Sequence, residues 1–263
     1  TTATGTSANT ILATNSGTLA RTGYTFAGWN TAANGSGTSY AAGLTTYTSS
    51  GNTTLYAQWN STITYNGNGN SGGTAPTATI AKGSAANTTL ANSGTMTRTG
   101  YSFAGWNTAA DASGTDYASG LTTYQSSGNI TLYAKWNANT NNIIYNANGG
   151  TGSSPSTPTT VSSGSTFIVP ANTFTKSGYK FVNWSDGTNT YAVGATYPSS
   201  GSVTQAVTLT ATWLQVPVVT NVSSSTNNGT YKTGDSISIQ VTFSTSVTVT
   251  GTPTLTLETG ATD

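Results

Sequence analysis

The sequence contains no cysteine and no histidine. Without cysteine the chain cannot form disulfides, thiolate metal sites or a thiol nucleophile. Without histidine it also lacks the commonest general base of enzymes. These absences predict a protein that is not an enzyme and that holds no cofactor.

Charge is also scarce. Only 5% of the residues are charged, and seven basic side chains nearly cancel six acidic ones. A nucleic-acid-binding protein needs a basic stripe that releases counterions from phosphates, and this sequence has none. A membrane-spanning helix needs roughly 20 consecutive apolar residues, whereas the apolar runs here extend over only a few positions. We therefore expect no nucleic-acid partner and no membrane insertion in this segment.

What the sequence does contain is a repeated aromatic phrase. GYTFAGWN begins at Gly23, GYSFAGWN at Gly100 and GYKFVNW at Gly178. A second series of tryptophans closes each copy in the phrases LYAQW, LYAKW and LTATW. Both series recur at intervals of about 77 residues, so one repeat has this length.

The repeat divides the chain into three copies and a tail, with boundaries at residues 1–60, 61–137, 138–214 and 215–263. Aligning the copies places Thr1 opposite Ala78, so the first copy lacks a counterpart of Ser61–Thr77. The tail carries no repeat text. We interpret the chain as part of a longer protein.

The composition of the repeats predicts a mainly β fold with little helix, because strand-like phrases alternate with Gly/Asn turn clusters. In YTFAGW, Tyr24 and Phe26 share one face of an extended strand, and Trp29 falls on the other face. A β-bulge at Gly28 would return Trp29 to the first face, and we favour that bulge. The aromatic residues are the expected structural core: Tyr24, Phe26, Trp29, Trp59, Tyr101, Phe103, Trp106, Trp136, Tyr179, Phe181, Trp184 and Trp213.

The tail alternates in a different way. Ile237, Ile239, Val241 and Phe243 share one parity, and turn residues recur at intervals of about 8–12 residues. This pattern predicts the start of an immunoglobulin-like β-sandwich.

The repeat text resembles the Listeria–Bacteroides repeat, also known as the internalin B-type repeat. The second copy carries the likeness in YNGNGNSGGT from Tyr65, RTGYSFAGWN from Arg98, YASGLTTY from Tyr117 and TLYAKW from Thr131. The third copy departs from the pattern in a shortened loop after Trp184. The resemblance implies tandem small β-grasp modules, each with a four- or five-stranded mixed sheet, along a bacterial surface protein. It also implies a spacer or adhesive role. The tail, from Tyr231 onward, is similar to the opening of an immunoglobulin-like module of bacterial adhesins.

Two carboxylates lie near each other in the second copy. The phrase DASGTD places Asp111 and Asp116 in one loop, where oxygen ligands would suit weak Ca²⁺ binding. The first copy has Asn34 and Ser39 at these positions, so the fold does not need the acids. We favour a solvated loop over a metal site.

Two tyrosines are candidates for ligand contact. Tyr47 and Tyr124 stand beside turns, where a ring exposed to solvent could stack on a glycan or touch a protein. Packing over the edge of the sheet is the alternative interpretation, and we favour it.

Three functions fit these observations. The first is a stalk or spacer in the extracellular part of a large bacterial surface protein or adhesin. The second is a module that binds a glycan or protein of a host or neighbouring cell, through exposed tyrosines or by strand addition at a sheet edge. The third is the subunit of a surface filament, in which incomplete ends of neighbouring chains exchange strands.

Overall fold

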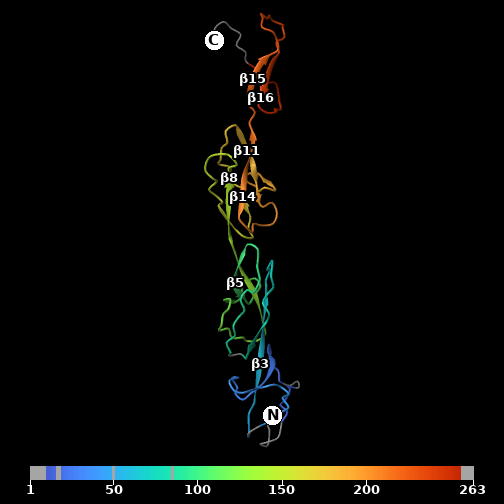
Figure 1. Ribbon diagram of the computed structural model, residues 1–263, viewed down its shortest axis with the longest axis vertical. Coiled ribbons are helices and arrows are strands. Elements are labelled where there is room, and N and C mark those ends of the chain that lie inside the picture. The colour runs from blue at the N-terminus through green and yellow to red at the C-terminus, as the bar shows by residue number, and fades with distance from the viewer. Residues whose placement is uncertain (1–9, 16–18, 49–50, 84–85, 256–263) are drawn as a thin grey trace. The chain divides into compact units, whose positions relative to one another are not determined.

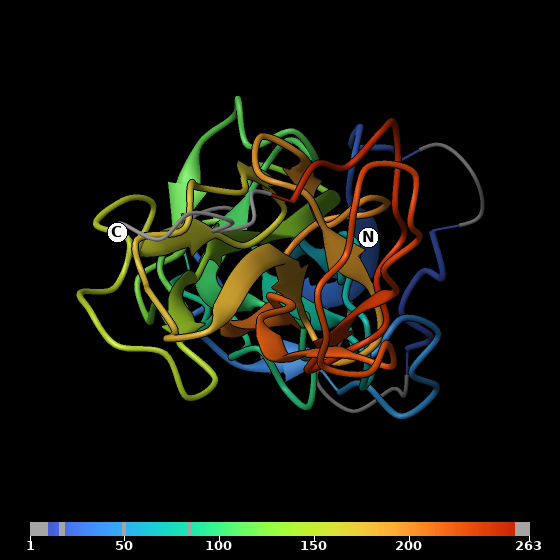
Figure 2. The ribbon, with the colours of Figure 1, turned by 90° about the horizontal axis from the view of Figure 1, so that it is seen from above.

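The computed structural model describes residues 10–15, 19–48, 51–83 and 86–255, and every regular element in this part of the chain is a strand (Figure 1; Figure 2). The fold is therefore mainly β, as the sequence predicts. The chain divides into two compact units. The first contains Thr1–Asn139 with Ser162–Gly164, and the second contains Thr140–Val161 with Ser165–Asp263.

The second copy forms a mixed sheet in the order β4-β3-β7-β5-β6. Its strands are β3 (Tyr56–Asn66), β4 (Thr79–Lys82), β5 (Tyr101–Asn107), β6 (Asp116–Tyr117) and β7 (Ile130–Ala138). The two central strands are parallel, with Ile63 of β3 opposite Ile130 of β7, and the outer pairs are antiparallel. This five-stranded arrangement agrees with the four- or five-stranded mixed sheet with little helix that the family resemblance implies.

The third copy repeats this arrangement in a five-stranded sheet of order β12-β11-β14-β8-β9. Its central strands are again parallel, with Ile143 of β8 opposite Val207 of β14. An additional pair, β10 with β13, lies outside this sheet. The strands are β8 (Thr140–Asn146), β9 (Thr160–Ser162), β10 (Phe167–Ile168), β11 (Tyr179–Ser185), β12 (Thr190–Tyr191), β13 (Thr196–Tyr197) and β14 (Val207–Gln215).

The first copy shares a strand with the second. Its β1 (Thr25–Asn30) pairs with β2 (Ser39–Tyr40) and with the first half of β3. The second half of β3 pairs with β4 and β7 of the next copy. One uninterrupted strand therefore closes the first repeat and opens the second (Figure 1). The sequence boundary at 60/61 falls inside this strand.

The expected β-bulge is present in the first two copies. The register between β1 and β3 shifts between Phe26 and Gly28, and the same shift occurs between Phe103 and Gly105 of β5. Both glycines have a positive φ, which residues with a side chain rarely adopt. The extra residue returns the following tryptophan to the face of the preceding phenylalanine.

Two tryptophans lie at the centres of the cores. Trp106 and Trp184 are both 0% exposed. The ring of Tyr65 lies 4.6 Å from that of Trp106, and the ring of Tyr145 lies 5.3 Å from that of Trp184. Around them, partly buried Phe103, Trp136, Phe181 and Trp213 pack against the same clusters.

The first tyrosine of the repeated phrase departs from the expected core. Tyr179 is 38% exposed, and Tyr24 and Tyr101 are only half-buried. Each ring instead lies under the basic side chain three residues earlier. The distances to the ring centroid are 4.1 Å for Arg21, 4.2 Å for Arg98 and 4.6 Å for Lys176. The tyrosine stands at or just before the start of its strand, and a cation over its face takes the place of packing in the core.

The tail contains one two-stranded sheet among its described residues. β15 (Val219–Ser224) pairs antiparallel with β16 (Ile239–Phe243). Most apolar residues of these strands are exposed, among them Val222 and Val241. The immunoglobulin-like sandwich stays a prediction, because two strands do not make one.

Candidate functional site

The two tyrosines considered for ligand contact do not face solvent. Tyr47 and Tyr124 are each 6% exposed. Their rings pack edge-to-face on Tyr40 and Tyr117, at centroid distances of 4.9 and 5.0 Å. Burial raises the pKa of the Tyr124 phenol. Both tyrosines lie in loops, and the backbone of each forms a β-bridge to a distant residue, Thr10 for Tyr47 and Thr88 for Tyr124. These bridges hold the loops in place, so that the rings point toward Tyr40 and Tyr117 and away from solvent.

The two carboxylates of the second copy have separate partners. Asp111 accepts hydrogen bonds from the backbone N–H and the hydroxyl of Ser113, at 3.0 and 2.6 Å, and these bonds lower its pKa. Asp116 accepts from Lys135 and from Asn107, and both bonds lower its pKa. A calcium ion at Asp116 would have to displace the Lys135 ammonium. Within the described ranges no three acidic side chains converge as metal ligands.

An asparagine that sequence reasoning missed organises the loop around these acids. Asn107 is 1% exposed, and its amide donates to the carbonyl of Gly114 and to Asp116 while its oxygen accepts from the N–H groups of Ala109 and Gly114. In the first copy Asn30 makes the equivalent bonds, with Ser39 in place of the acid. The sequence feature that indicates this role is the asparagine that directly follows the tryptophan of the repeated phrase in both copies.

A tight turn after β3 seals one end of the second copy. Its Asn68, at a φ of 46°, donates from the side-chain amide to the carbonyls of Ala110 and Ala134, at 2.8 and 3.0 Å. The indole N–H of Trp136 donates to the carbonyl of Gly67 at 3.0 Å. The turn thus covers Trp136 and satisfies its only polar group.

The third copy has the same seal. Asn148, in the turn after β8, donates to the carbonyl of Ala211 at 2.9 Å, and Trp213 donates to the carbonyl of Ala147 at 2.8 Å. The ammonium of Lys176 donates to the carbonyl of Asn148 at 3.1 Å. The second and third copies therefore share this turn, which covers Trp136 in one and Trp213 in the other.

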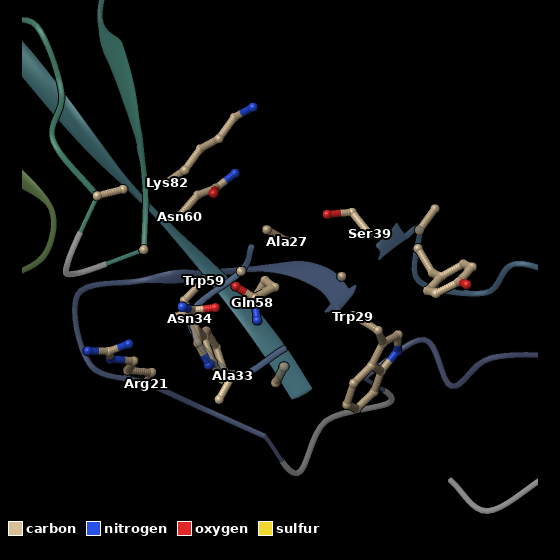
Figure 3. A pocket seen from close by; sticks show the side chains of 17 residues that line it. Arg21, Ala27, Trp29, Ala33, Asn34, Ser39, Gln58, Trp59, Asn60 and Lys82 are labelled. Atoms are coloured by element: carbon tan, nitrogen blue, oxygen red, sulfur yellow. The ribbon is translucent and has the colours of Figure 1, made fainter. Parts of the chain in front are cut away.

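The first copy has a cavity of about 570 Å³ at the corresponding place (Figure 3). Its lining includes Ala33, Ala57 and Trp59, which stand 77 residues before Ala110, Ala134 and Trp136. In Figure 3 the side chain of Trp29 lies apart from those of Ala33, Asn34 and Trp59. No described residue accepts a hydrogen bond from the indole N–H of Trp59.

The cavity is basic. Arg21 and Lys82 are its charged lining residues, and the sequence contains no acidic residue before Asp111. Amide side chains of Gln58 and Asn60 supply further polar groups. The side chains of these residues can therefore donate hydrogen bonds to acceptor atoms of a bound molecule, such as backbone carbonyl oxygens.

Comparison with known proteins identifies the family. The Listeria-Bacteroides repeat domain matches three times, at residues 1–58, 62–135 and 142–212. These matches cover most of the chain, and the chain belongs to this family of repeat domains.

Two relatives are proteins of Evansella cellulosilytica. One, named "Putative Gly-rich membrane protein", is 38% identical over 148 residues, which are 53% of this chain and 17% of the relative. The other, named "Putative membrane protein", is 43% identical over 91 residues, which are 34% of this chain and 14% of the relative. The chain thus matches less than a fifth of the length of either relative. No solved structure matches it. Among the described residues, none forms a helix that could span a bilayer.

Proposed function

We propose that this chain is a non-enzymatic stalk or spacer in the extracellular part of a larger bacterial surface protein. The observation that carries the proposal is the continuity of β3, which completes the sheet of the first repeat and begins the sheet of the second. Tension along such a strand passes from one repeat to the next through one continuous backbone that pairs with strands of both repeats. A flexible linker would leave the repeats free to bend.

Hydrogen bonds from the backbone and from side chains stabilise this junction. The backbone N–H of Asn129 donates to the carbonyl of Gly23 at 2.6 Å, and its side-chain oxygen accepts from the N–H of Thr62 at 2.8 Å. The hydroxyl of Tyr24 donates to the carbonyl of Ser126 at 3.0 Å. These bonds connect β1 of the first repeat with the segment that leads into β7 of the second, which supports a stiff junction.

A place in the cell envelope is part of the proposal. The names of both Evansella relatives assign them to the membrane, and the family resemblance implies surface proteins. The absence of histidine and cysteine and the pairing of Asp116 with Lys135 support a role without catalysis.

Two measurements test the spacer. Sedimentation velocity on the whole chain should give the high frictional ratio of a rod, and a ratio typical of a globular monomer would contradict the proposal. A variant with two glycines inserted between Asn60 and Ser61 interrupts β3 at the junction. We expect small-angle scattering to show a broader distance distribution for this variant, because the shared strand no longer couples the repeats.

Adhesion is the second candidate function. With Tyr47 and Tyr124 buried, recognition through those rings loses its support, and the sheet edges remain. Strand addition at a sheet edge is the recognition mode that this candidate uses. A filament formed by strand exchange between copies is a third candidate. It requires assembly that grows with concentration, and a monomer at all concentrations in sedimentation experiments would discard it.

A further inference from the structure

The first and second repeats carry the same loop after the repeated phrase. Asn30 and Asn107 organise the two loops through equivalent hydrogen bonds from backbone N–H groups. A backbone hydrogen bond of 3.1 Å closes the turn in each copy, and its donor is the N–H of Gly35 in the first and of Ala112 in the second. The geometry of this loop is therefore a property of the complete repeat.

The two loops differ in chemistry at the tip. The first repeat has Asn34 followed by Gly35, and the second has Asp111 followed by Ala112. The side-chain oxygen of Asn34 accepts from the N–H and from the hydroxyl of Ser36, at 3.1 and 2.7 Å. Asp111 accepts the same two bonds at 3.0 and 2.6 Å. A carboxylate thus fits this turn as well as an amide does.

Asn34 is placed for attack by its own backbone. Its hydrogen bonds form an Asx turn, which folds the side chain back toward the peptide that follows. The two donors of Ser36 polarise the side-chain carbonyl, as donors do that stabilise a developing oxyanion. The next residue is a glycine at a φ of 78°, so no Cβ hinders the approach of its nitrogen. Asn34 is exposed, as Asp111 is in the complete second repeat, so water reaches the site.

We propose that Asn34 is a site of spontaneous deamidation. The backbone nitrogen of Gly35 forms a bond to Cγ of Asn34, and the bond from Cγ to the side-chain nitrogen breaks. Ammonia leaves with the proton of the Gly35 amide, and a succinimide ring remains. One water then opens the ring to aspartate or to isoaspartate. Water is the only co-reactant of this sequence, and no electrons are transferred.

The reaction changes the charge of the first repeat. The sequence contains no acidic residue before Asp111, so the new carboxylate is the first in this part of the chain. The formal net charge of +1 at pH 7 falls by one charge. The aspartate product keeps the turn that Asp111 already forms, and the fraction converted records the time since synthesis. The inference goes beyond the spacer function and does not depend on it.

Two other Asn–Gly pairs are protected. The sequence contains five such pairs, and Asn34 is the one whose side-chain oxygen accepts two hydrogen bonds from described residues. Asn68 and Asn148 instead direct the side-chain nitrogen to carbonyl oxygens, Asn68 to two of them and Asn148 to one. These bonds hold the leaving group in place, and a carboxylate there would face the same carbonyl oxygens. Both asparagines serve as internal controls.

The test incubates the whole chain in mildly alkaline buffer and follows it by tandem mass spectrometry. Asn34 should gain the mass of an amide converted into an acid well before Asn68 and Asn148 do, and isoelectric focusing should show a more acidic band. The Gly35→Ala variant copies the second repeat, in which Ala112 has a φ of 62°. It should slow the conversion about tenfold, because the added methyl group restricts the backbone and hinders the attack.

A matched pair of variants tests the product. Asn34→Asp should leave hydrogen exchange in the first repeat unchanged, because it reproduces the bonds of Asp111. Asn68→Asp should accelerate exchange in the second repeat, because a carboxylate then faces two carbonyl oxygens. Conversion of Asn68 or Asn148 ahead of Asn34, an unchanged rate in Gly35→Ala, or faster exchange in Asn34→Asp would each overturn the inference. The rod-like sedimentation of the spacer does not depend on any of these outcomes.

Discussion

The hydroxyl of Ser61 donates a 2.7 Å hydrogen bond to the hydroxyl of Ser126, and both side chains are 1% exposed. Ser61 lies in β3 just past the point where the strand passes from the first repeat to the second. Ser126 in turn donates to the carbonyl of Gly128, which lies against Gly23. This buried chain of hydroxyls is part of the junction between the repeats.

The Ser126→Ala variant should therefore be less stable at the junction. The change leaves the buried hydroxyl of Ser61 without its acceptor, which costs about 1–3 kcal/mol. Hydrogen exchange in β3 and in the loop before β7 measures this loss. Ser127→Ala is the matched control, because Ser127 is exposed. Equal exchange in the two variants would contradict a structural role for the hydroxyl pair.

Replacing the tryptophan of the repeated phrase should have different effects in different copies. Trp106→Ala removes a fully buried ring and should destabilise the second repeat by about 3–5 kcal/mol. Trp29→Ala should cost clearly less, because the half-buried ring of Trp29 has less contact to lose. Local stabilities from hydrogen exchange compare the two, and equal losses would show that Trp29 is as well packed as Trp106.

The Gly105→Ala variant should destabilise the bulge in β5. Gly105 has a φ of 122°, and an added Cβ would lie 2.6 Å from the carbonyl oxygen of Tyr117. We expect a loss of about 1–3 kcal/mol in the second repeat, since both the backbone angle and the contact are unfavourable. Chemical denaturation monitored by exchange in β5 and β6 gives the value. Ala104→Ser, at the exposed neighbouring position, should change stability little.

The third repeat should lose stability at alkaline pH through Tyr145. Burial raises the pKa of its phenol from 10.0 to about 12. Below pH 10 the phenol is protonated in both the folded and the unfolded chain, so it contributes no pH dependence. Between about pH 10 and 12 the unfolded chain releases this proton and the folded chain keeps it, so the free energy of unfolding falls as pH rises.

The Tyr145→Phe variant separates this effect from other alkaline effects. At neutral pH it should be less stable by about 0.5–1.5 kcal/mol, because the hydrogen bond from the phenol to the carbonyl of Pro158 is lost. Above pH 10 its stability should fall less steeply than that of the original chain. Parallel slopes in denaturation experiments at pH 9 to 11.5 would assign the alkaline loss to other groups.

The sequence alone predicted the features that depend on neighbouring residues and on repetition. The spacing of the tryptophans predicted three copies, and turn clusters between strand-like phrases predicted a mainly β fold. The bulge followed from a parity argument, since Trp29 and Phe26 reach the same face only if Gly28 adds a residue. The family resemblance rested on the same ordered phrases, and the family match covers all three copies.

Other features became visible only when distant segments came together. Alternation indicates which residues share a face of a strand, but it does not indicate which face another segment will cover. Tyr124 is buried because its own backbone bridges back to Thr88, 36 positions earlier in the chain. Tyr179 is 38% exposed although it belongs to an aromatic phrase, because the Lys176 ammonium lies over its ring in place of core side chains.

The sequence by itself thus determined that this protein is built from three β-repeats with an aromatic core and few charges. Only the tertiary structure decided that β3 belongs to two repeats at once. It also decided that the Trp106 side chain is fully buried while that of Trp29 is only half-buried. The physical reason is that a β-strand is completed by partners along its edges and across its face. Those partners come from chain segments tens of residues away, as Ile130 does for Ile63.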